Sequence, residues 1–403
     1  MSVSLRRRAV FGATVLAMAS GLWPGSKARG QEASPPRLEV GGVPAINFDA
    51  DEGFGYGAIV ELYHYGPRGR GSYEWTLQPT VFLTTRGRRD FTVFFDSPSL
   101  LPQGWRVDAF AGSEKQIATP YYGLGNATPY DATLDDDEGP DPYYYRFGRT
   151  RRSLTFNLQR SILESPLRLL FGGGIVGTEI EPVPEDRGTT LYRQELGTSE
   201  GTEWSNYVRG GLVWDTRDRE TGPRRGSWTE VLVQWVDEGL GADLNFTRWT
   251  FTDRRYIPLG DRLVFAHRYL LQGVSSGAPA YELFRVQTSF KQQEGLGGAR
   301  TVRGVLKNRF VGRGMLVWNA ELRWRVGDFR LLGRASHVVL SAFVDQGRVW
   351  DEEIRIDELL TDLHRGIGGG VRLGFGENFI VALDIGTSEE TGMPIYIGIG
   401  YLY

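Results

Sequence analysis

Residues 315–326, MLVWNAELRWRV, alternate apolar and polar side chains with a period of two. The even positions carry Leu316, Trp318, Ala320, Leu322, Trp324 and Val326, and the odd positions include Asn319, Glu321, Arg323 and Arg325. Successive side chains of a strand point to opposite faces, so one face of this segment suits lipid and the other suits water. A soluble sandwich also alternates, but two arginines and a glutamate in one row favour a wet barrel interior.

The same alternation recurs over the rest of the chain and predicts an all-β protein. It favours sixteen antiparallel strands, near 41–49, 53–65, 71–84, 89–97, 104–115, 144–160, 166–180, 205–217, 226–237, 243–257, 261–274, 310–326, 336–350, 365–375, 378–387 and 393–403. The first of these is short and contains Pro44. Its alternative is an extended arm, which would make the strand count odd.

The connections between the strands indicate how the barrel is oriented. The long ones, 116–143, 181–204, 275–309 and 351–364, are the fifth, seventh, eleventh and thirteenth, so all four lie at one end. Long loops outside and short turns in the periplasm are typical of outer-membrane barrels. An even strand count then puts both termini in the periplasm.

The N-terminus has the three parts of a signal peptide. Arg6–Arg8 form the charged region, Ala9–Trp23 the apolar core, and Ala28–Gly30 offer small residues before a cut at Gln31. An uncleaved anchor is the alternative. No later segment reaches the ~18 apolar residues of a membrane helix, so a membrane-spanning chain must close into a barrel. The predicted parts are a signal peptide at 1–30, a short periplasmic segment at 31–40 and an outer-membrane barrel at 41–403.

The composition excludes several classes of function. The chain has no cysteine and therefore neither disulfides nor a thiolate metal site. Its net charge of -3 becomes about -8 without the five cations of residues 1–30, which argues against a nucleic-acid partner. His64, His267, His337 and His364 show no metal-ligand spacing, and no nucleophile-elbow motif is present. We therefore predict no enzyme activity, no cofactor and no metal site.

Three segments stand out from the strand pattern. The first is Trp214–Asp218 followed by Pro223 and Gly226, the second is Gly297–Gly304, and the third is Phe343–Gly347. In this order they resemble the BamA/TamA-type outer-membrane assembly superfamily, also called the bacterial surface antigen family. The resemblance runs from Gly53 to Tyr403, and the Val302-Arg303-Gly304 signature is its most specific part.

The resemblance implies a loop that folds back into the barrel lumen. Arg303 at its tip would meet Asp345 and Glu321, both on the row of side chains that faces the interior. A forked guanidinium can bind two carboxylate oxygens, which suits a crowded wet lumen. The first segment, with Asp215, Arg217, Asp218, Pro223 and Gly226, is expected to form a polar periplasmic turn.

The last residues resemble the signal that the outer-membrane assembly machinery reads. Gly398 is followed by aromatic residues at alternate positions, Tyr401 and Tyr403. An ordinary lipid-facing strand is the alternative. The chain departs from the family in carrying Val305 after the Val-Arg-Gly signature and in having no room for the periplasmic POTRA domains.

The functional expectation follows from this resemblance. We predict a POTRA-less barrel that acts in insertion, translocation or secretion of protein or lipid, in contact with outer-membrane lipid and with a separate periplasmic partner. The barrel, the inserted loop and a weak seam between the first and last strands are what the family implies best. A passive or gated pore and a barrel hydrolase are the alternatives.

Overall fold

The computed structural model describes residues 37–49, 53–66, 73–101, 104–135, 141–163, 165–181, 188–197, 201–289, 293–331, 333–376 and 378–403. The predicted signal peptide and residues 31–36 of the predicted periplasmic segment lie outside these ranges. Among the described residues, no helix is long and apolar enough to cross a membrane. Helical turns are short, with α1 at Leu191–Leu196, α2 at Ala280–Leu283, η2 at Glu238–Leu240 and η3 at Ile356–Glu358.

The structure is an antiparallel β-barrel, as predicted. Its strands in the first half are β1 Arg37–Asp49, β2 Gly53–Tyr65, β3 Trp75–Thr84, β4 Arg89–Leu101, β5 Trp105–Pro120, β6 Arg146–Ser161, β7 Leu167–Glu181, β8 Thr202–Trp204 and β9 Tyr207–Asp215. Those in the second half are β10 Gly226–Val236, β11 Phe246–Pro258, β12 Leu263–Val274, β15 Gly314–Leu331, β16 Arg334–Trp350, β17 His364–Phe375, β18 Phe379–Thr387 and β19 Ile395–Ile399. Because β8 and β9 both pair with β7, they form one interrupted strand, and the described residues contain sixteen barrel strands.

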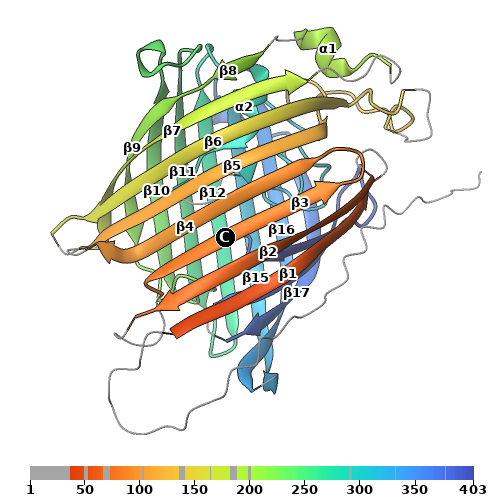
Figure 1. Cartoon of the computed structure of the whole chain (residues 1–403). Coiled ribbons are helices and arrows are strands. Elements are labelled where there is room, and N and C mark those ends of the chain that lie inside the picture. Colours follow the sequence, from red (N-terminus) through yellow and green to blue (C-terminus); the bar gives the residue numbers. More distant parts are fainter. Residues whose placement is uncertain are drawn as a thin grey trace, which may run out of the picture.

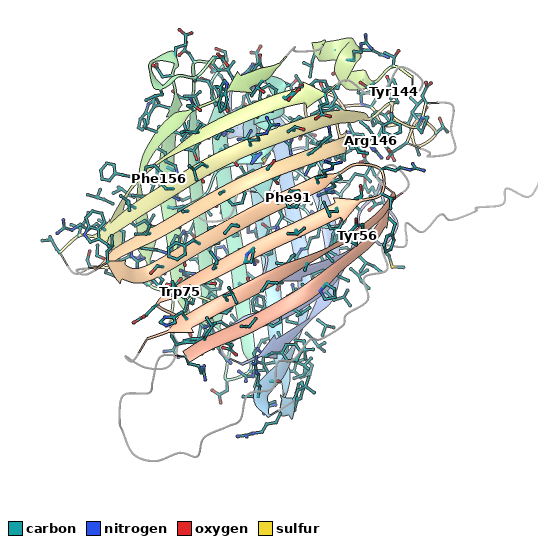
Figure 2. The ribbon with its side chains drawn as sticks, viewed as in Figure 1. Tyr56, Trp75, Phe91, Tyr144, Arg146 and Phe156 are labelled. Carbon is teal, nitrogen blue, oxygen red and sulfur yellow. The ribbon has the colours of Figure 1, made fainter. Side chains whose placement is uncertain are left out.

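Alternating burial along the strands separates the barrel interior from its outer surface. On β6, the side chains of Leu154 and Phe156 are about half exposed. Thr155 and Asn157, which alternate with them, are buried. Phe91 and Phe156 stand on the outer surface in Figure 2. Apolar outside and polar inside is the arrangement that lipid imposes on a barrel wall. On β15 the quoted alternation holds from Trp318 onward, whereas Leu316 is buried.

The two ends of the barrel differ. The end that carries α1 and the long connections, at the top of Figure 1, is called the loop end below. The opposite end, where β1 begins, is called the turn end, and the long β15–β16 hairpin projects from it. A loop from the loop end, described at residues 275–289 and 293–313, enters the lumen and includes α2 and the small hairpin of β13 (Arg285–Val286) and β14 (Gln293–Glu294). The inserted loop of the predicted fold is therefore present.

The first and last strands differ from the prediction. β1 begins at Arg37 and has 13 residues, so the short strand predicted from residue 41 is wrong. Pro44 is tolerated there because a proline can lie in a strand at the edge of a ladder. β19 has 5 residues and ends at Ile399, so the strand predicted to continue to residue 403 is also wrong. Gly400 takes a φ of +81°, which is the left-handed region that ends extended structure.

The early end of β19 leaves β1 against β18. The amide of Gly400 donates to the carbonyl of Ile380, and beyond this point β19 has turned away from β18. Phe379 of β18 then packs with Val43 of β1, and its ring lies where a side chain at Gly41 would be. At the turn end the seam between the first and last strands is thus closed by apolar contact with β18.

Candidate functional site in the barrel lumen

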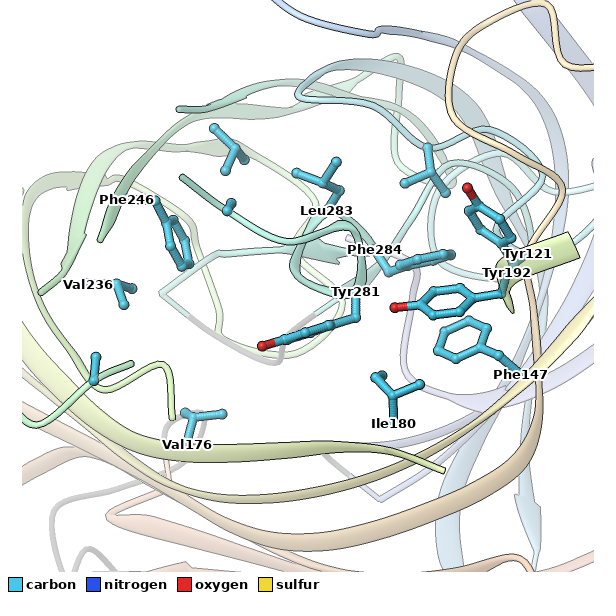
Figure 3. Close-up of a cluster of buried hydrophobic side chains, with 14 of the residues drawn as sticks. Tyr121, Phe147, Val176, Ile180, Tyr192, Val236, Phe246, Tyr281, Leu283 and Phe284 are labelled. Carbon is cyan, nitrogen blue, oxygen red and sulfur yellow. The ribbon is translucent and has the colours of Figure 1, made fainter. Parts of the chain in front are cut away.

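The inserted loop is held at its outer part by aromatic packing. Phe284 packs in a buried cluster with Tyr121, Phe147 and Tyr192, and the Phe147 and Tyr192 rings stack with 4.3 Å between their centroids. Figure 3 shows these rings converging from the loop and the barrel wall. Such ring pairs add roughly 0.5–1.5 kcal/mol each beyond the area they bury. The cluster therefore fastens the root of the loop at the loop end.

One carboxylate of the loop joins two strands of the wall. Glu282 on α2 accepts from Arg151 of β6 at 2.9 Å and from Arg248 of β11 at 3.2 Å. Ser205 donates to the same carboxylate at 3.0 Å. Burial acts to raise the pKa of Glu282, but the two guanidinium groups outweigh it and hold this pKa well below its usual value. The loop is thus anchored by a charged group that stays ionised.

The tip of the loop carries Arg303, which is fully buried in the lumen. Its Nε and Nη2 donate to the two carboxylate oxygens of Asp345, at 2.7 and 3.1 Å. Nη1 donates to Glu321 at 3.2 Å. The structure thus places Arg303 against both acids that the resemblance assigns to it. The guanidinium also lies over the ring of Phe343 at 3.5 Å, a cation–π contact.

A third acid at this site was missed by the sequence reasoning. Nη1 of Arg303 also donates to Asp384 of β18 at 3.0 Å, and Asp384 in turn binds Arg372 at 2.6 Å. Asp384 stands alone among the apolar residues of β18, which is a signal that its side chain faces the interior. We call Arg303, Glu321, Asp345 and Asp384 the tip cluster.

The charges at the tip cluster are balanced. Three carboxylates, on Glu321, Asp345 and Asp384, meet three guanidinium groups, on Arg303, Arg323 and Arg372. Burial lowers the pKa of Arg303, but Asp345 and the other two acids outweigh it, so the pKa is raised above its usual value. A buried charge is tolerated only when it is paired and hydrogen-bonded in this way.

Glycine allows the loop tip to touch the wall. Gly304 has a φ of +97°, and its amide donates to the Tyr396 hydroxyl of β19 at 2.9 Å. A Cβ at Gly366 of β17 would collide with the carbonyl oxygen of Arg303. Val302, which precedes the arginine, is buried in an apolar cluster with Met315 and Val317 of β15. The three residues of the Val-Arg-Gly signature therefore serve packing, charge pairing and close approach, respectively.

The polar turn predicted after β9 folds under the lumen. Arg217 binds Asp215 at 2.9 Å and Glu220 at 2.9 Å, and its guanidinium stacks on Trp228 of β10 at 4.5 Å. Glu220, which the sequence reasoning missed, also accepts from Arg106 of β5 at 3.1 Å. This turn thus links β9 and β10 to β5, from which β6 and β7 separate them along the wall, at the turn end of the lumen.

The other predicted residues of this turn shape its backbone. The carboxylate of Asp218 accepts from the amide of Arg224 at 2.9 Å. Pro223 is buried, and Gly226 has a φ of +97° with no room for a Cβ beside the carbonyl of Thr216. These residues close the turn, which agrees with the turn chemistry expected of them.

The residues predicted as an assembly signal lie apart from one another. Gly398 is in β19 opposite Ala382, whereas Tyr401 and Tyr403 turn into the lumen. The Tyr403 hydroxyl donates to the carbonyl of Ala266 at 3.0 Å, and Arg323 lies over the Tyr401 ring at 4.1 Å. An alternating pattern alone cannot separate this inward turn from a lipid-facing strand.

No group of three or more aspartate, glutamate or histidine side chains suited to a metal ion occurs among the described residues. In the charged groups described above, around Glu282, Arg303 and Arg217, the acids are paired with arginines. The geometry is that of a membrane barrel whose lumen is occupied by its own loop, its own turn and its own last residues. It defines the class of membrane barrels that carry segments of their own chain inside the lumen.

The family follows from comparison with known proteins. Residues 75–387 match the model of the Omp85 superfamily domain. The chain therefore belongs to the Omp85 superfamily, and the resemblance found in the sequence is confirmed. It is an outer-membrane protein of this superfamily. A search of curated proteins found no match.

Solved structures show the same fold. One is the crystal structure of BamA from Haemophilus ducreyi lacking POTRA domains 1–3, with a TM-score of 0.54 and 13% identity, over 97% of this chain and 76% of that one. Another is CdiB from Escherichia coli, with a TM-score of 0.56 and 12% identity, over 96% of this chain and 66% of that one. At such identities the likeness extends to the fold alone.

Proposed function

We propose that this protein acts in the insertion, translocation or secretion of protein or lipid at the outer membrane, and that it works by opening along the seam between β1 and the last strands. In this proposal the turn end, where β1 begins and β19 ends, faces the periplasm and the loop end faces outward. Outer-membrane lipid surrounds the barrel, and a separate periplasmic protein presents the client. The proposed role is not catalytic.

The observation that carries the proposal is where the tip cluster is attached. Arg303 is bound to β15, β16 and β18, and the next residue, Gly304, is bound to β19. A single loop tip therefore ties together the strands on one side of the seam. Releasing the tip would loosen the strands whose edge meets β1, so the state of the loop and the state of the seam are coupled.

The short last strand supports the same mechanism. β18 and β19 share five paired residues, Val381–Ile385 with Ile395–Ile399, whereas β15 and β16 pair along their whole lengths. Fewer ladder hydrogen bonds hold this edge of the sheet, and opening there costs less than opening elsewhere. The tip of the inserted loop and the turn after β9 both lie in the lumen, which supports this proposal over a passive pore.

The experiment is depletion of the protein from its host, followed by quantitative proteomics and lipid analysis of outer membranes. The proposal expects the loss of particular outer-membrane or surface components, restored by the wild-type gene. Asp345→Arg should fail to restore them, whereas Arg193→Glu, at an exposed arginine of α1, should restore them. An unchanged membrane composition, together with a steady wide conductance of the wild-type protein in planar bilayers, would identify a pore instead.

We also propose that Gly398, Tyr401 and Tyr403 guide the protein's own insertion by the outer-membrane assembly machinery. The inward position of Tyr401 and Tyr403 belongs to the folded barrel, and a signal is read before folding. Replacing Tyr403 by serine should slow the appearance of the heat-modifiable folded form in the membrane. The exposed Ile395 of β19, replaced by serine, is a control on the strand that precedes these tyrosines.

A further inference from the structure

A cavity opens at the turn end of the barrel, and Arg323 in its lining connects it to Glu321 of the tip cluster. It lies between the turn after β9, the beginnings of β12, β16 and β18, the second half of β15, and Tyr401. Its volume is about 500 Å³, including the solvent at its mouth. Its walls are in part apolar, from Val264, Val339 and Ile380. The superfamily assignment and the mechanism proposed above do not involve this cavity.

The lining of this cavity is strongly basic. Five of the thirteen lining residues are arginines and none is an aspartate or a glutamate; the arginines are Arg219, Arg224, Arg262, Arg323 and Arg325. They come from two turns and from β15, so three separate parts of the chain bring cations to one place. Arginines are held together against their mutual repulsion only when anions compensate them.

The protein itself supplies fewer anions than these arginines need. Asp328 pairs with Arg325, Asp218 lies 3.9 Å from Arg219, and Glu321 binds Nε of Arg323. The last of these acids is shared with the tip cluster. Three acidic side chains therefore face five guanidinium groups, and one of the three, Glu321, also binds Arg303 and Arg372, so positive charge is in excess among the lining side chains.

The other two arginines lack a carboxylate in the described part of the chain. Arg224 donates to main-chain carbonyls of Gly260 and Asp261, and no ion pair involves the exposed Arg262. Both groups can therefore turn toward an anion in the cavity without giving up an acid partner. They form the outer part of a basic site whose inner part is Arg323.

Arg323 shows that the site is incomplete. Its side chain is 4% exposed, with Nε bound to Glu321 and Nη2 bound to the main-chain oxygen of Tyr403. Its Nη1 is buried and has no hydrogen-bond partner among the described residues. An unpaired donor of a buried guanidinium is destabilising. Arg323 therefore brings a buried positive charge to the inner wall of the cavity.

We propose that this cavity binds a phosphoryl group. A phosphoryl group has several oxygens and one to two negative charges, which match the excess of positive charge and the arginines Arg224 and Arg262 that have no acid partner among the described residues. Guanidinium forks suit tetrahedral oxyanions better than a single ammonium does. The apolar wall formed by Val264, Val339 and Ile380 leaves room for the carbon skeleton of a phosphate ester.

Two sources offer this chemistry, inorganic phosphate and the headgroup of an anionic phospholipid. Titration calorimetry of the full-length protein in detergent would use inorganic phosphate and dihexanoyl phosphatidic acid, the latter below its micelle concentration. Hexaglutamate serves as an acidic peptide of comparable charge. We expect saturable binding of at least one phosphate probe. Binding of the lipid alone identifies a headgroup site, and binding of inorganic phosphate identifies a free-phosphate site.

The variants separate the cavity from general charge. Arg262→Glu changes an exposed lining residue that makes no contact with the tip cluster or with Tyr403, so the folded barrel should remain. It should weaken phosphate binding about tenfold or more, the effect of losing one charge-assisted contact. Arg330→Glu reverses an exposed charge on the β15–β16 hairpin outside the cavity and should leave binding unchanged. Equal affinity in both variants, tighter binding of hexaglutamate, or no saturable binding would overturn the proposal.

Discussion

Reversing the charge of Arg303 should release the tip of the inserted loop. The guanidinium makes four charge-assisted contacts, two to Asp345 and one each to Glu321 and Asp384. A hydrogen bond to a charged group contributes about 1.5–3 kcal/mol. The four contributions cannot simply be added, because contacts within one network are not independent. When Arg303 is replaced, its three acid partners keep different numbers of other hydrogen-bond partners. The acid that keeps the fewest determines the free-energy cost of the substitution.

Glu321 keeps Arg323, and Asp384 keeps Arg372, when Arg303 is replaced. Of the hydrogen bonds to Asp345 within the described part of the chain, only the one from the amide of residue 303, at 3.1 Å, then remains. One buried carboxylate is therefore left without a cation, and breaking a buried pair in this way costs about 3–5 kcal/mol. At about 1.4 kcal/mol for each factor of ten, the detached tip should become more populated by about two to three orders of magnitude.

Limited proteolysis with proteinase K measures this change. In purified folded protein, Arg303→Glu and Asp345→Arg should each expose residues 295–310 to cleavage and shift heat-modifiability, while Arg193→Glu should not. The double variant Arg303→Glu/Asp345→Arg should regain part of the protection, because the pair is restored with reversed polarity. Wild-type protection in both single variants would refute this account of the loop.

Two further substitutions test the packing of the lumen. Gly366→Ala places a Cβ against the carbonyl oxygen of Arg303 at the loop tip and should increase cleavage of the loop. The control Gly392→Ala places a Cβ where no atom lies within 4 Å and should leave cleavage unchanged. Equal cleavage in the two variants would argue against a close approach of the loop tip to Gly366. Burial acts to raise the pKa of Glu220, but Arg106 and the neighbouring arginines outweigh it and lower the pKa to about 2. The ion pairs of Glu220 therefore stabilise the turn above pH ~4.5 and are lost as the pH falls toward 2. In Glu220→Gln the melting temperature should fall less over this pH range than in the wild type. An identical pH profile in the variant would contradict a stabilising role of these ion pairs.

Much of the fold was predictable because the alternation is local. Strand positions follow from side-chain period, and the grouping of long loops at one end follows from counting. The contact of Arg303 with Asp345 was predictable only through the family resemblance. Its contact with Asp384 depends on how the barrel wall curves round to β18, and a strand pattern shows an inward acid without showing its partner.

The end of β19 could not be predicted for a different reason. Tyrosine suits both a lipid interface and a crowded wet lumen, because its ring is apolar and its hydroxyl is polar. The period of two also continues through Tyr401 and Tyr403. What decides the outcome is tertiary: Arg323 and Ala266 offer a cation and a carbonyl inside the lumen. Glu220 was missed likewise, because its partner Arg106 is distant in sequence.

The most direct test of the proposed mechanism is a reversible crosslink across the seam. A Cβ at Gly41 would lie 2.7 Å from Cγ of Phe379, so cysteines at both positions bring their Cβ atoms within the roughly 4.5 Å that a disulfide requires. The chain has no other cysteine to interfere. The matched control, Gly42→Cys/Val60→Cys, links β1 to its neighbour β2, where these residues are paired.

The measurement is the outer-membrane composition of depleted cells that carry each crosslinked variant, with and without reductant. The account predicts that the oxidised Gly41→Cys/Phe379→Cys protein fails to restore the missing components, that reductant recovers them, and that the control restores them in both states. Full restoration by the oxidised seam variant, with the crosslink verified, would contradict opening along this seam.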